Sequence, residues 1–459
     1  SAQTVPAYQE FLKANNINPS SIDSKESFER LPVVTKENYL KKYPLKQLLI
    51  NGDTSDAKII SLSSGSSGKP FYWPRGNKSI EDSAEILDEL FEATFETKTK
   101  ETLCVMAFAM GTWIAGTYML SAMFELVNRG HKIVCITPGI NKAEIIQTLS
   151  EIGEQFDQII IMGYPPFIKD IVDATVNESI DIDKFHLRFV YAGENISENW
   201  RDYVSEKIKA RDVYTFSLSI FGTADAGIIG IESPFTIYLR KLIDKTPALF
   251  EAFFPGAEIL PTMVQYNPEL RYVEVVNGHI VFTANNSLPL VRYDIQDEGT
   301  VLTEEQVSAV LKKNNITIPE KYARFNSRPI IALFGRPDVA AMFYGLNIYP
   351  ENVKYGLEVE QLQNYITGKF IIKTEVNEKT LGQSLHLYVE LKKNVVSEEG
   401  IKEAIFVSVM ASLTANNSEF HKLHSELKRK AEPIIHLVDF GSPEFEIGIK
   451  HRWVTKRKP

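Results

Sequence analysis

Cysteine is scarce in this chain, and positive charge is not in excess. Its 459 residues include only two cysteines, Cys104 and Cys135, and each lies within an apolar run. Two buried thiols make neither a disulfide framework nor a zinc cluster, so the sequence suits a reducing cytoplasm. With 50 basic residues against 59 acidic ones, the net charge is −9. This balance argues against nucleic acids and anionic membranes as partners, because both attract a basic surface.

Segments that would direct the chain into a membrane are not expected either. The N-terminus is polar and lacks the apolar core of a signal peptide. One uncharged run, Leu103 to Phe124, is nominally long enough to span a bilayer, but Gly111 and Gly116 interrupt it. A buried strand, a turn and a buried helix explain this run better. The sequence also has no Gly-x-Ser-x-Gly elbow, no His/Cys cluster of metal spacing and no internal repeat.

The pattern of elements predicts an α/β fold. The length is that of about two to four domains. Between residues 80 and 215, short β-branched runs alternate with amphipathic segments, which is typical of βαβ units and a largely parallel sheet. The expected strands are 103–110, 132–136, 158–162, 188–191 and 212–215, and the expected helices are 80–97, 113–129, 141–152, 165–175 and 196–209. Ligands of such folds bind beyond the carboxyl ends of the strands.

The second part of the chain changes character. From about residue 255 to 334, shorter strands with Pro and Gly turns predict a β-rich subdomain. After a break at 334–338, a separate α+β domain is expected. Its expected strands are 370–376, 385–391 and 434–440, and its helices are about 397–414 and 418–430.

The stretch from Ser61 to Pro70 has little side chain to bury and many backbone N–H groups to offer. Glycine takes positive φ at little cost, so that successive N–H groups can point into one concavity and bind an anion. The hydroxyls add donors, and Lys69 adds a positive charge for a phosphate oxygen. This expected polyphosphate clamp consists of Ser63, Ser64, Gly65, Ser66, Ser67, Gly68 and Lys69. A flexible Ser/Gly linker is the alternative.

A first polar turn, Ala192-Gly193-Glu194-Asn195, follows the strand expected at 188–191. Gly193 would let a flat ring lie on the backbone, and Glu194 and Asn195 can bond the edge of that ring. The alternative is a helix N-cap region with Glu194 near the helix dipole.

A second turn contains Phe221, Gly222, Thr223 and Asp225 within five residues. The ring can stack on a base, the Thr223 hydroxyl can bond an α-phosphate, and the Asp225 carboxylate can hold Mg²⁺ through hard oxygen contacts. An ordinary glycine turn with an Asx cap is the alternative.

In this order and spacing, the clamp and the two turns resemble signatures of the adenylate-forming (acyl-activating) enzymes, in the branch typified by phenylacetate–CoA ligase. The clamp matches Ser-Ser-Gly-Ser-Ser-Gly-Lys-Pro. Ala192 replaces the first glycine of the family's Gly-Gly-Glu turn. In the family's Tyr-Gly-x-Thr-Glu motif, Phe221 stands for Tyr and Asp225 for Glu. The shorter carboxylate leaves direct metal contact open.

The resemblance extends to the segment from Pro289 to Asp297, which is similar to the family's Tyr-x-Thr-Gly-Asp motif. It implies that Asp297 binds the two ribose hydroxyls, since a carboxylate can accept both donors at once. Gln296 replaces the usual glycine and Ile295 the threonine. Asp294 is the local competitor for this role.

The segments Gly335-Arg336-Pro337-Asp338 and Gly345-Leu346-Asn347-Ile348-Tyr349-Pro350 also match the family. The resemblance implies that Arg336 contacts the ribose or the α-phosphate, and that Asp338 is a hinge for the C-terminal domain. Gly345, Asn347 and Tyr349 would line an acceptor tunnel. An ordinary interdomain loop is the alternative.

The last signature is altered. Gly448-Ile449-Lys450-His451-Arg452 is similar to the family's Gly-Lys-x-x-Arg, but its lysine comes one place late. The resemblance implies that this lysine neutralises charge as the substrate carboxylate attacks the α-phosphate. Because one residue along a strand reverses the side chain's face, either a bulge restores Lys450 to the site or the lysine function is weakened.

The resemblance covers nearly the whole chain and implies a two-step ligase that uses ATP, Mg²⁺ and coenzyme A. We expect residues 1–334 to form a large domain that binds ATP and the acyl group, with parallel sheets flanked by helices. Residues 335–338 would be the hinge, and 339–459 a small mobile α+β lid. A cytoplasmic location is expected, and a homodimer stays open.

The expected substrate is a small-molecule carboxylic acid. Phe108, Gly111 and Trp113 are expected to line the acyl pocket, although core packing explains them almost equally well. Two other functions stay open. One is an adenylating ligase whose acceptor is an amine or a carrier-protein thiol, and the other is a nucleotide- or acid-binding module with little catalysis.

Overall fold

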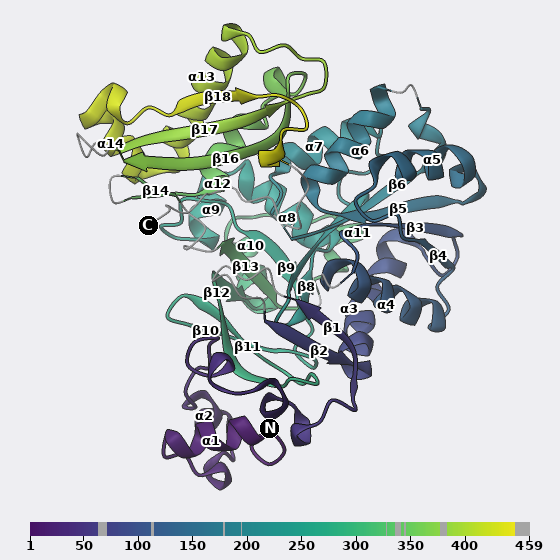
Figure 1. Cartoon of the computed structure of the whole chain (residues 1–459), viewed down its shortest axis with the longest axis vertical. Coiled ribbons are helices and arrows are strands. Elements are labelled where there is room, and N and C mark those ends of the chain that lie inside the picture. The colour runs from purple at the N-terminus through teal and green to yellow at the C-terminus, as the bar shows by residue number, and fades with distance from the viewer. Residues whose placement is uncertain are drawn as a thin grey trace.

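A computed structural model describes residues 1–62, 71–111, 114–177, 180–193, 195–326, 328–335, 341–343, 346–376 and 383–445. Its centre is an 11-stranded sheet with the strand order β10-β11-β12-β13-β9-β8-β7-β6-β5-β3-β4. Helices lie along this sheet, and a separate 3-stranded sheet with its own helices forms a smaller unit toward the C-terminus (Figure 1). The fold is therefore α/β with an additional α+β unit, as the sequence predicts.

One half of the large sheet is parallel. Its strands are β3 (Thr102–Ala107), β4 (Ile133–Ile136), β5 (Gln158–Gly163), β6 (Leu187–Ala192) and β7 (Ser217–Thr223). The helices around them are α3 (Asn77–Phe95), α4 (Ile114–Asn128), α5 (Lys142–Ile152), α6 (Pro165–Asn177) and α7 (Glu198–Lys207). Every residue of β3 and β5 is buried. Their uninterrupted apolar sequences follow from this, because helices cover both faces of a parallel sheet.

The other half continues the same sheet with antiparallel pairs. Its strands are β8 (Gly227–Ile231), β9 (Thr262–Gln265), β10 (Tyr272–Val276), β11 (His279–Ala284), β12 (Leu290–Leu302) and β13 (Ile330–Gly335). Its helices are α8 (Pro234–Asp244), α9 (Pro247–Phe253), α10 (Glu304–Lys313) and α11 (Glu320–Ala323). The expected parallel pairing therefore holds only from β4 to β7.

The strand expected at 212–215 is wrong, because these residues form a turn. Asp212 Oδ1 accepts a hydrogen bond from the Tyr214 backbone N–H over 2.9 Å, as Asp does in turns. β7 begins only at Ser217, so Phe221 and Thr223 belong to the end of this strand. The polar turn that follows the strand consists of residues 224–226.

The uncharged run Leu103–Phe124 contains all of β3 except its first residue, and most of α4. None of the helices within the described ranges has the length and apolar character that a bilayer crossing requires. Cys104 is buried as expected, whereas Cys135 is only partly buried, because β4 forms an edge of the sheet.

The N-terminal residues pack on the antiparallel half of the sheet. They include α1 (Pro6–Ala14), α2 (Lys25–Glu29) and a hairpin of β1 (Ala57–Leu62) and β2 (Tyr72–Gly76). Their apolar side chains share one core with those of β10 to β13, separate from the core of the parallel half. Val34 forms a parallel bridge with Tyr293 of β12, which ties the N-terminal segment to the sheet.

The smaller unit has a third core of its own. It contains β14 (Ala341–Phe343), β15 (Leu346–Ile348), α12 (Pro350–Leu357), β16 (Ile366–Val376), β17 (Gln383–Leu391), α13 (Glu399–Asn416), α14 (Ser418–Leu427) and β18 (Ile434–Val438). The domain boundaries 1–334, 335–338 and 339–459 stay predictions.

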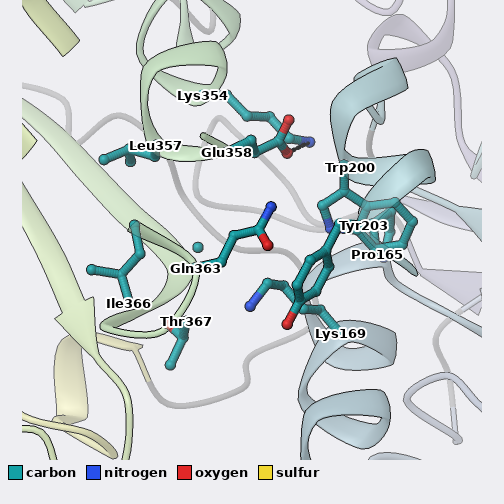
Figure 2. A pocket seen from close by; sticks show the side chains of 11 residues that line it. Pro165, Lys169, Trp200, Tyr203, Lys354, Leu357, Glu358, Gln363, Ile366 and Thr367 are labelled. Carbon is teal, nitrogen blue, oxygen red and sulfur yellow. Dashed lines mark ion pairs between the residues drawn. The ribbon is translucent and has the colours of Figure 1, made fainter. Parts of the chain in front are cut away.

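This smaller unit docks on α6 through one buried and one partly buried ion pair. Lys369 Nζ of β16 lies 3.0 Å from Asp170 Oδ2 of α6, and both side chains are 8% exposed. Lys392 Nζ lies 3.1 Å from Asp173 Oδ2 of the same helix. Next to these pairs is a hollow between α6, α7, α12 and β16, and Gln363 extends toward its centre (Figure 2). Because desolvation offsets much of the attraction between buried charges, such pairs mainly specify the docked arrangement.

The docking can be measured with a double-mutant cycle of Asp170→Asn and Lys369→Met in urea unfolding. We expect a coupling free energy of about 1–3 kcal/mol, because each single change leaves a desolvated partner. The exposed pair Lys184–Glu154, with side chains 50% and 61% exposed, is the matched control. It should give less than about 1 kcal/mol. A coupling no larger than that of the control would contradict the role given to the buried pair.

Candidate active site

Several residues that the sequence assigns to the site lie outside the described ranges. They are Ser63, Ser64, Gly65, Ser66, Ser67, Gly68, Lys69, Trp113, Glu194, Arg336, Asp338, Gly345 and Lys450. Their assignments stay predictions. The described residues next to them nevertheless define where the site would be.

The two strands that flank residues 63–70 pair with each other, with Leu62 opposite Tyr72. From β2, the buried Arg75 donates a hydrogen bond to the backbone oxygen of Ala224 and lies 4.8 Å from the Tyr118 ring centroid. The hairpin that carries the expected phosphate clamp is thus attached to the turn between β7 and β8.

That turn holds Asp225 in a buried position, 5% exposed. The Tyr293 hydroxyl donates to Asp225 Oδ2 over 2.5 Å. Lys36 Nζ lies 3.2 Å from the same oxygen. Thr223 Oγ1 accepts from the Ala226 backbone N–H over 3.1 Å and closes the turn. Thr223 and Asp225 are therefore held together at the end of β7, as the motif requires.

Sequence reasoning missed Lys36 and assigned no role to Tyr293. Lys36 lies between Asp225 and the Trp73 ring, whose centroid is 5.8 Å from Nζ. A local signal for this turn exists, since Thr35 Oγ1 accepts a hydrogen bond from the Asn38 backbone N–H over 3.0 Å. Pairing of this segment with β12 fixes where Lys36 points, and no local pattern encodes that pairing.

The motif in the first half of β12 contains a left-handed residue where the family has glycine. Gln296 takes φ 62°, and its backbone N–H donates to Asp294 Oδ1 over 2.7 Å. The other oxygen of Asp294 lies 3.1 Å from His279 Nδ1. Asp294 thus supports the local backbone. Asp297 is buried, 7% exposed, and its expected ribose contact stays a prediction.

The turn after β6 lies beside β7, because Ala192 pairs with Ile220. Gly193 takes φ 88°, and a Cβ at this position would lie 3.0 Å from the Tyr164 ring. Glycine is therefore required here for both backbone and space. This arrangement brings Gly193 close to the partly exposed Phe221 of β7.

Tyr164 also contacts Phe108, with ring centroids 5.1 Å apart in an edge-to-face arrangement. Phe108 is fully buried in the main core, as the core-packing alternative expects. Gly111 is exposed with φ 85°. An acyl-pocket role for these residues stays a prediction.

The expected acceptor residues lie in the smaller unit. Asn347 is in β15, and Tyr349 precedes α12, where its backbone N–H donates to Asn352 Oδ1 over 3.1 Å. Contacts from α12 reach the turn after β6. Lys354 donates to the backbone oxygen of Asn195, and Glu358 accepts from the Ser197 hydroxyl.

A second hollow lies at this junction, lined by Asn195, Ser197, Arg240, Thr262, Phe334 and Tyr355 among others. It therefore adjoins the expected nucleotide turn, the end of β13 and α12. Burial raises the pKa of Glu358.

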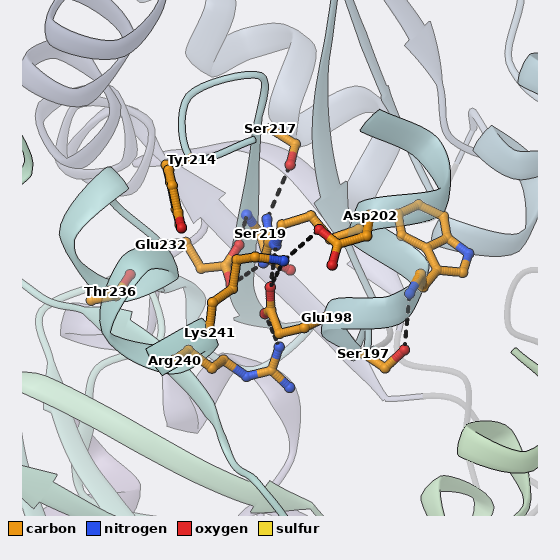
Figure 3. A network of polar contacts seen from close by, with 12 residues as sticks. Ser197, Glu198, Asp202, Tyr214, Ser217, Ser219, Glu232, Thr236, Arg240 and Lys241 are labelled. Carbon is orange, nitrogen blue, oxygen red and sulfur yellow. Dashed lines mark hydrogen bonds and ion pairs between the residues drawn. The ribbon is translucent and has the colours of Figure 1, made fainter. Parts of the chain in front are cut away.

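A buried network of charges joins α7, α8 and Glu232, which directly follows β8 (Figure 3). Arg201 of α7 donates to Glu198 over 3.1 Å and to Glu232 over 2.7 Å. Glu198 also pairs with Arg240 and Lys241 of α8. Burial opposes ionisation of Glu198, but the three surrounding cations hold its pKa below the usual value.

The network extends into β7. Glu232 Oε2 accepts from the Ser219 backbone N–H over 2.8 Å, and Arg201 donates to the Ser217 hydroxyl over 3.0 Å. Burial raises the pKa of Glu232. Since α7 follows one site turn and β7 leads into the other, this network fixes the two turns relative to each other.

Whether the site suits a magnesium ion depends on which metal-ligating side chains it offers. No group of three or more His, Cys, Asp or Glu side chains in the described part of the chain could hold a metal by itself. Asp225 offers one carboxylate, already paired with Lys36. Such a site suits a Mg²⁺ that arrives with substrate phosphates and takes one or two protein carboxylates.

Comparisons with known proteins agree with this geometry at the level of the fold. No protein-family model and no curated protein sequence matches this chain. Crystal structures of 2-hydroxyisobutyryl-CoA ligase do match at 16% identity. In the postadenylation state with 2-HIB-AMP, the match covers 100% of this chain and 86% of that chain with a TM-score of 0.68.

Two further structures are similar. The same ligase with 2-HIB-AMP and CoA in the thioesterification state gives a TM-score of 0.53, with 99% of this chain and 86% of that chain covered at 16% identity. The AtGH3.15 acyl acid amido synthetase in complex with 2,4-DB gives 0.58 at 13% identity, over 95% of this chain and 87% of that chain. The chain has the fold of the adenylate-forming enzymes.

In this fold, the expected site residues lie where an open α/β sheet binds ligands. Gly193 follows the carboxyl end of β6, and Thr223 and Asp225 lie at the carboxyl end of β7. These two strands are adjacent and parallel. Loops at such neighbouring strand ends form the crevice of doubly wound sheets.

The charge network predicts a large stability effect for Arg201→Met. This change removes the guanidinium that faces two buried carboxylates, so we expect a loss of about 3–5 kcal/mol in the free energy of unfolding. Urea denaturation measures it. Lys209→Met, in an ion pair with side chains 72% and 47% exposed, is the control and should cost less than about 1 kcal/mol. Equal effects would refute the claim that the network holds the turns.

Proposed function

We propose that this chain activates a carboxylic acid with ATP through an acyl-adenylate and transfers the acyl group to coenzyme A. The observation that supports this most is the convergence on Asp225. The β1–β2 hairpin, the β7–β8 turn and the Tyr293 motif of β12, all signature segments of the resemblance, meet there through Arg75 and Tyr293. The adenylate-forming fold supports the same reading.

In the first step, a substrate carboxylate oxygen attacks the α-phosphorus of ATP, and the bond to pyrophosphate breaks. Negative charge then accumulates on the phosphate oxygens, so prearranged cations and N–H donors lower the barrier. Thr223 supplies a hydroxyl at the end of β7, and Lys36 supplies a positive charge beside Asp225. Lys69 and Lys450 are the other proposed cations.

Lys36 has a particular role in this proposal. The C-terminal lysine of the family motif is displaced by one residue here, whereas Lys36 is held next to the Asp225 carboxylate. We assign it the task of orienting Asp225 and drawing the anionic phosphates toward the turn. Asp225 would hold Mg²⁺, which, when bound with the nucleotide, neutralises charge on the transferring phosphate.

In the second step, the acceptor attacks the acyl carbon and AMP leaves. Coenzyme A is the acceptor we propose, since 2-hydroxyisobutyryl-CoA ligase is similar over the whole chain. An amine acceptor is the second candidate, because an acyl acid amido synthetase is also similar, with a TM-score of 0.58. Transfer to a carrier-protein thiol would follow the same chemistry.

Acid-dependent exchange of labelled pyrophosphate into ATP tests the first step with a panel of aryl and short aliphatic acids. We expect exchange with at least one acid, and a rate about 10²-fold lower in Lys36→Met, because one charge that faces the phosphates is removed. Lys41→Met changes the same charge in the same segment at a side chain 42% exposed and should leave the rate unchanged. No exchange with any acid would leave only the binding-module function. Equal rates in both variants would remove Lys36 from the mechanism.

The acceptor is identified separately. Once an acid supports exchange, parallel reactions are supplied with coenzyme A or with a mixture of amines and analysed by mass spectrometry. We expect an acyl thioester in the reaction with coenzyme A and no amide in the reaction with amines. Detection of an amide alone would replace coenzyme A by the second candidate without affecting the adenylation step.

A further inference from the structure

Two cysteines face each other at the edge of the large sheet. Cys104 of β3 and Cys135 of β4 are direct partners in the parallel register, so their side chains project from the same face of the sheet. Interaction with the neighbouring Cys135 thiol, together with burial, raises the pKa of Cys104, and interaction with Cys104 lowers the pKa of Cys135. The two thiols differ in access, since Cys104 is buried and Cys135 is partly exposed.

The geometry suits a disulfide. Neighbouring strands lie about 4.8 Å apart, within the range of Cα separations that a disulfide bridges. The Cβ atoms must approach each other slightly. β4 can make this adjustment, because it pairs with β3 alone at the end of the sheet, and its Val134 is 56% exposed.

The loop after β4 lies against the segment expected to line the acyl pocket. The Gly139 backbone N–H donates to the Met106 oxygen over 3.0 Å. Gly139 also lies close to Met110 and to the backbone oxygen of Phe108, which an added Cβ would meet at 3.4 and 3.5 Å. A shift of β4 toward β3 would therefore change the positions of residues 106–111.

We propose that Cys104 and Cys135 are a redox-sensitive dithiol that a peroxide converts into a cross-strand disulfide, which changes the shape of segment 106–111. The Cys135 sulfur attacks one oxygen of hydrogen peroxide, giving a sulfenic acid and water. The Cys104 sulfur then attacks the sulfenic sulfur, and the second oxygen leaves as water. Two thiols and one peroxide thus give one disulfide and two waters, and a reducing thiol reverses the reaction.

Disulfide formation does not depend on the proposed function, whereas its effect on acid binding rests on it. The test treats the purified full chain with a small excess of hydrogen peroxide, then denatures, alkylates and digests it for mass spectrometry. We expect a linked peptide pair containing Cys104 and Cys135 that dithiothreitol separates. In Cys135→Ser, Cys104 should stay a free thiol. In Cys104→Ser, Cys135 should be trapped as a sulfenic acid by dimedone.

Two outcomes would overturn the disulfide: both thiols remaining alkylatable, or oxidation of Cys135 beyond the sulfenic acid in the wild type while Cys104 stays free. The structural effect is measured by hydrogen–deuterium exchange of peptides that cover 102–111 and 133–140. It should change on oxidation of the wild type but not of Cys135→Ser.

In the pyrophosphate exchange assay, oxidation should raise the KM for the acid about tenfold, because small displacements of a positioning surface have large effects. A disulfide that forms without either change would refute the link to segment 106–111. A chain that shows no exchange before oxidation would refute the proposed function, yet the linked peptide would still decide the disulfide.

Discussion

The buried carboxylate of Asp225 depends on two partners from distant parts of the chain. A carboxylate that is 5% exposed is costly unless it is paired and hydrogen-bonded. Lys36 comes from the N-terminal segment and Tyr293 from β12, while Asp225 itself lies in the turn after β7. Satisfying this one group therefore requires that the N-terminal segment, the antiparallel half and the parallel half of the sheet be assembled together.

The rest of the site follows from that assembly. Parallel pairing of β6 and β7 places two polar turns at one edge, and the network around Arg201 fixes α7 to β7. The smaller unit contacts the same region, because Lys354 of α12 donates to the backbone oxygen of Asn195. A nucleotide at this edge would thus contact the large sheet directly and lie near the docked unit.

Much of the fold could be predicted from local pattern. Continuous apolar runs such as 159–162 mark strands buried on both faces. The three strands β16, β17 and β18 lie within a few residues of the predicted ones, whereas the short β14 and β15 were not predicted. The prediction of a strand at 212–215 is wrong because the Asp212 side chain accepts a backbone hydrogen bond and forms a turn, although Val213 and Thr215 favour a strand. The predicted burial of Cys135 is wrong, since β4 is at the edge of the sheet. The hydrophobicity of a strand does not reveal whether the strand is central or at an edge.

Residues of the candidate site could be proposed from the sequence only where they stand in short motifs. Gly193, Thr223, Asp225 and Asp297 stand in such motifs, and the left-handed φ of Gln296 fits the glycine that it replaces. Lys36 could not be predicted, because its role depends on a bridge between Val34 and Tyr293 that joins distant segments. The contacts between α6 and the smaller unit could not be predicted either, because they also join segments that are distant in the sequence.

The central claim is that a nucleotide binds at the edge formed by the turns after β6 and β7. Photolabelling with 8-azido-ATP, followed by peptide mapping, tests it most directly. The account predicts label in peptides that contain Gly193–Asn195 or Phe221–Gly227, and loss of that label when unmodified ATP is present in excess. Label confined to other parts of the chain, or label that ATP does not displace, would contradict it.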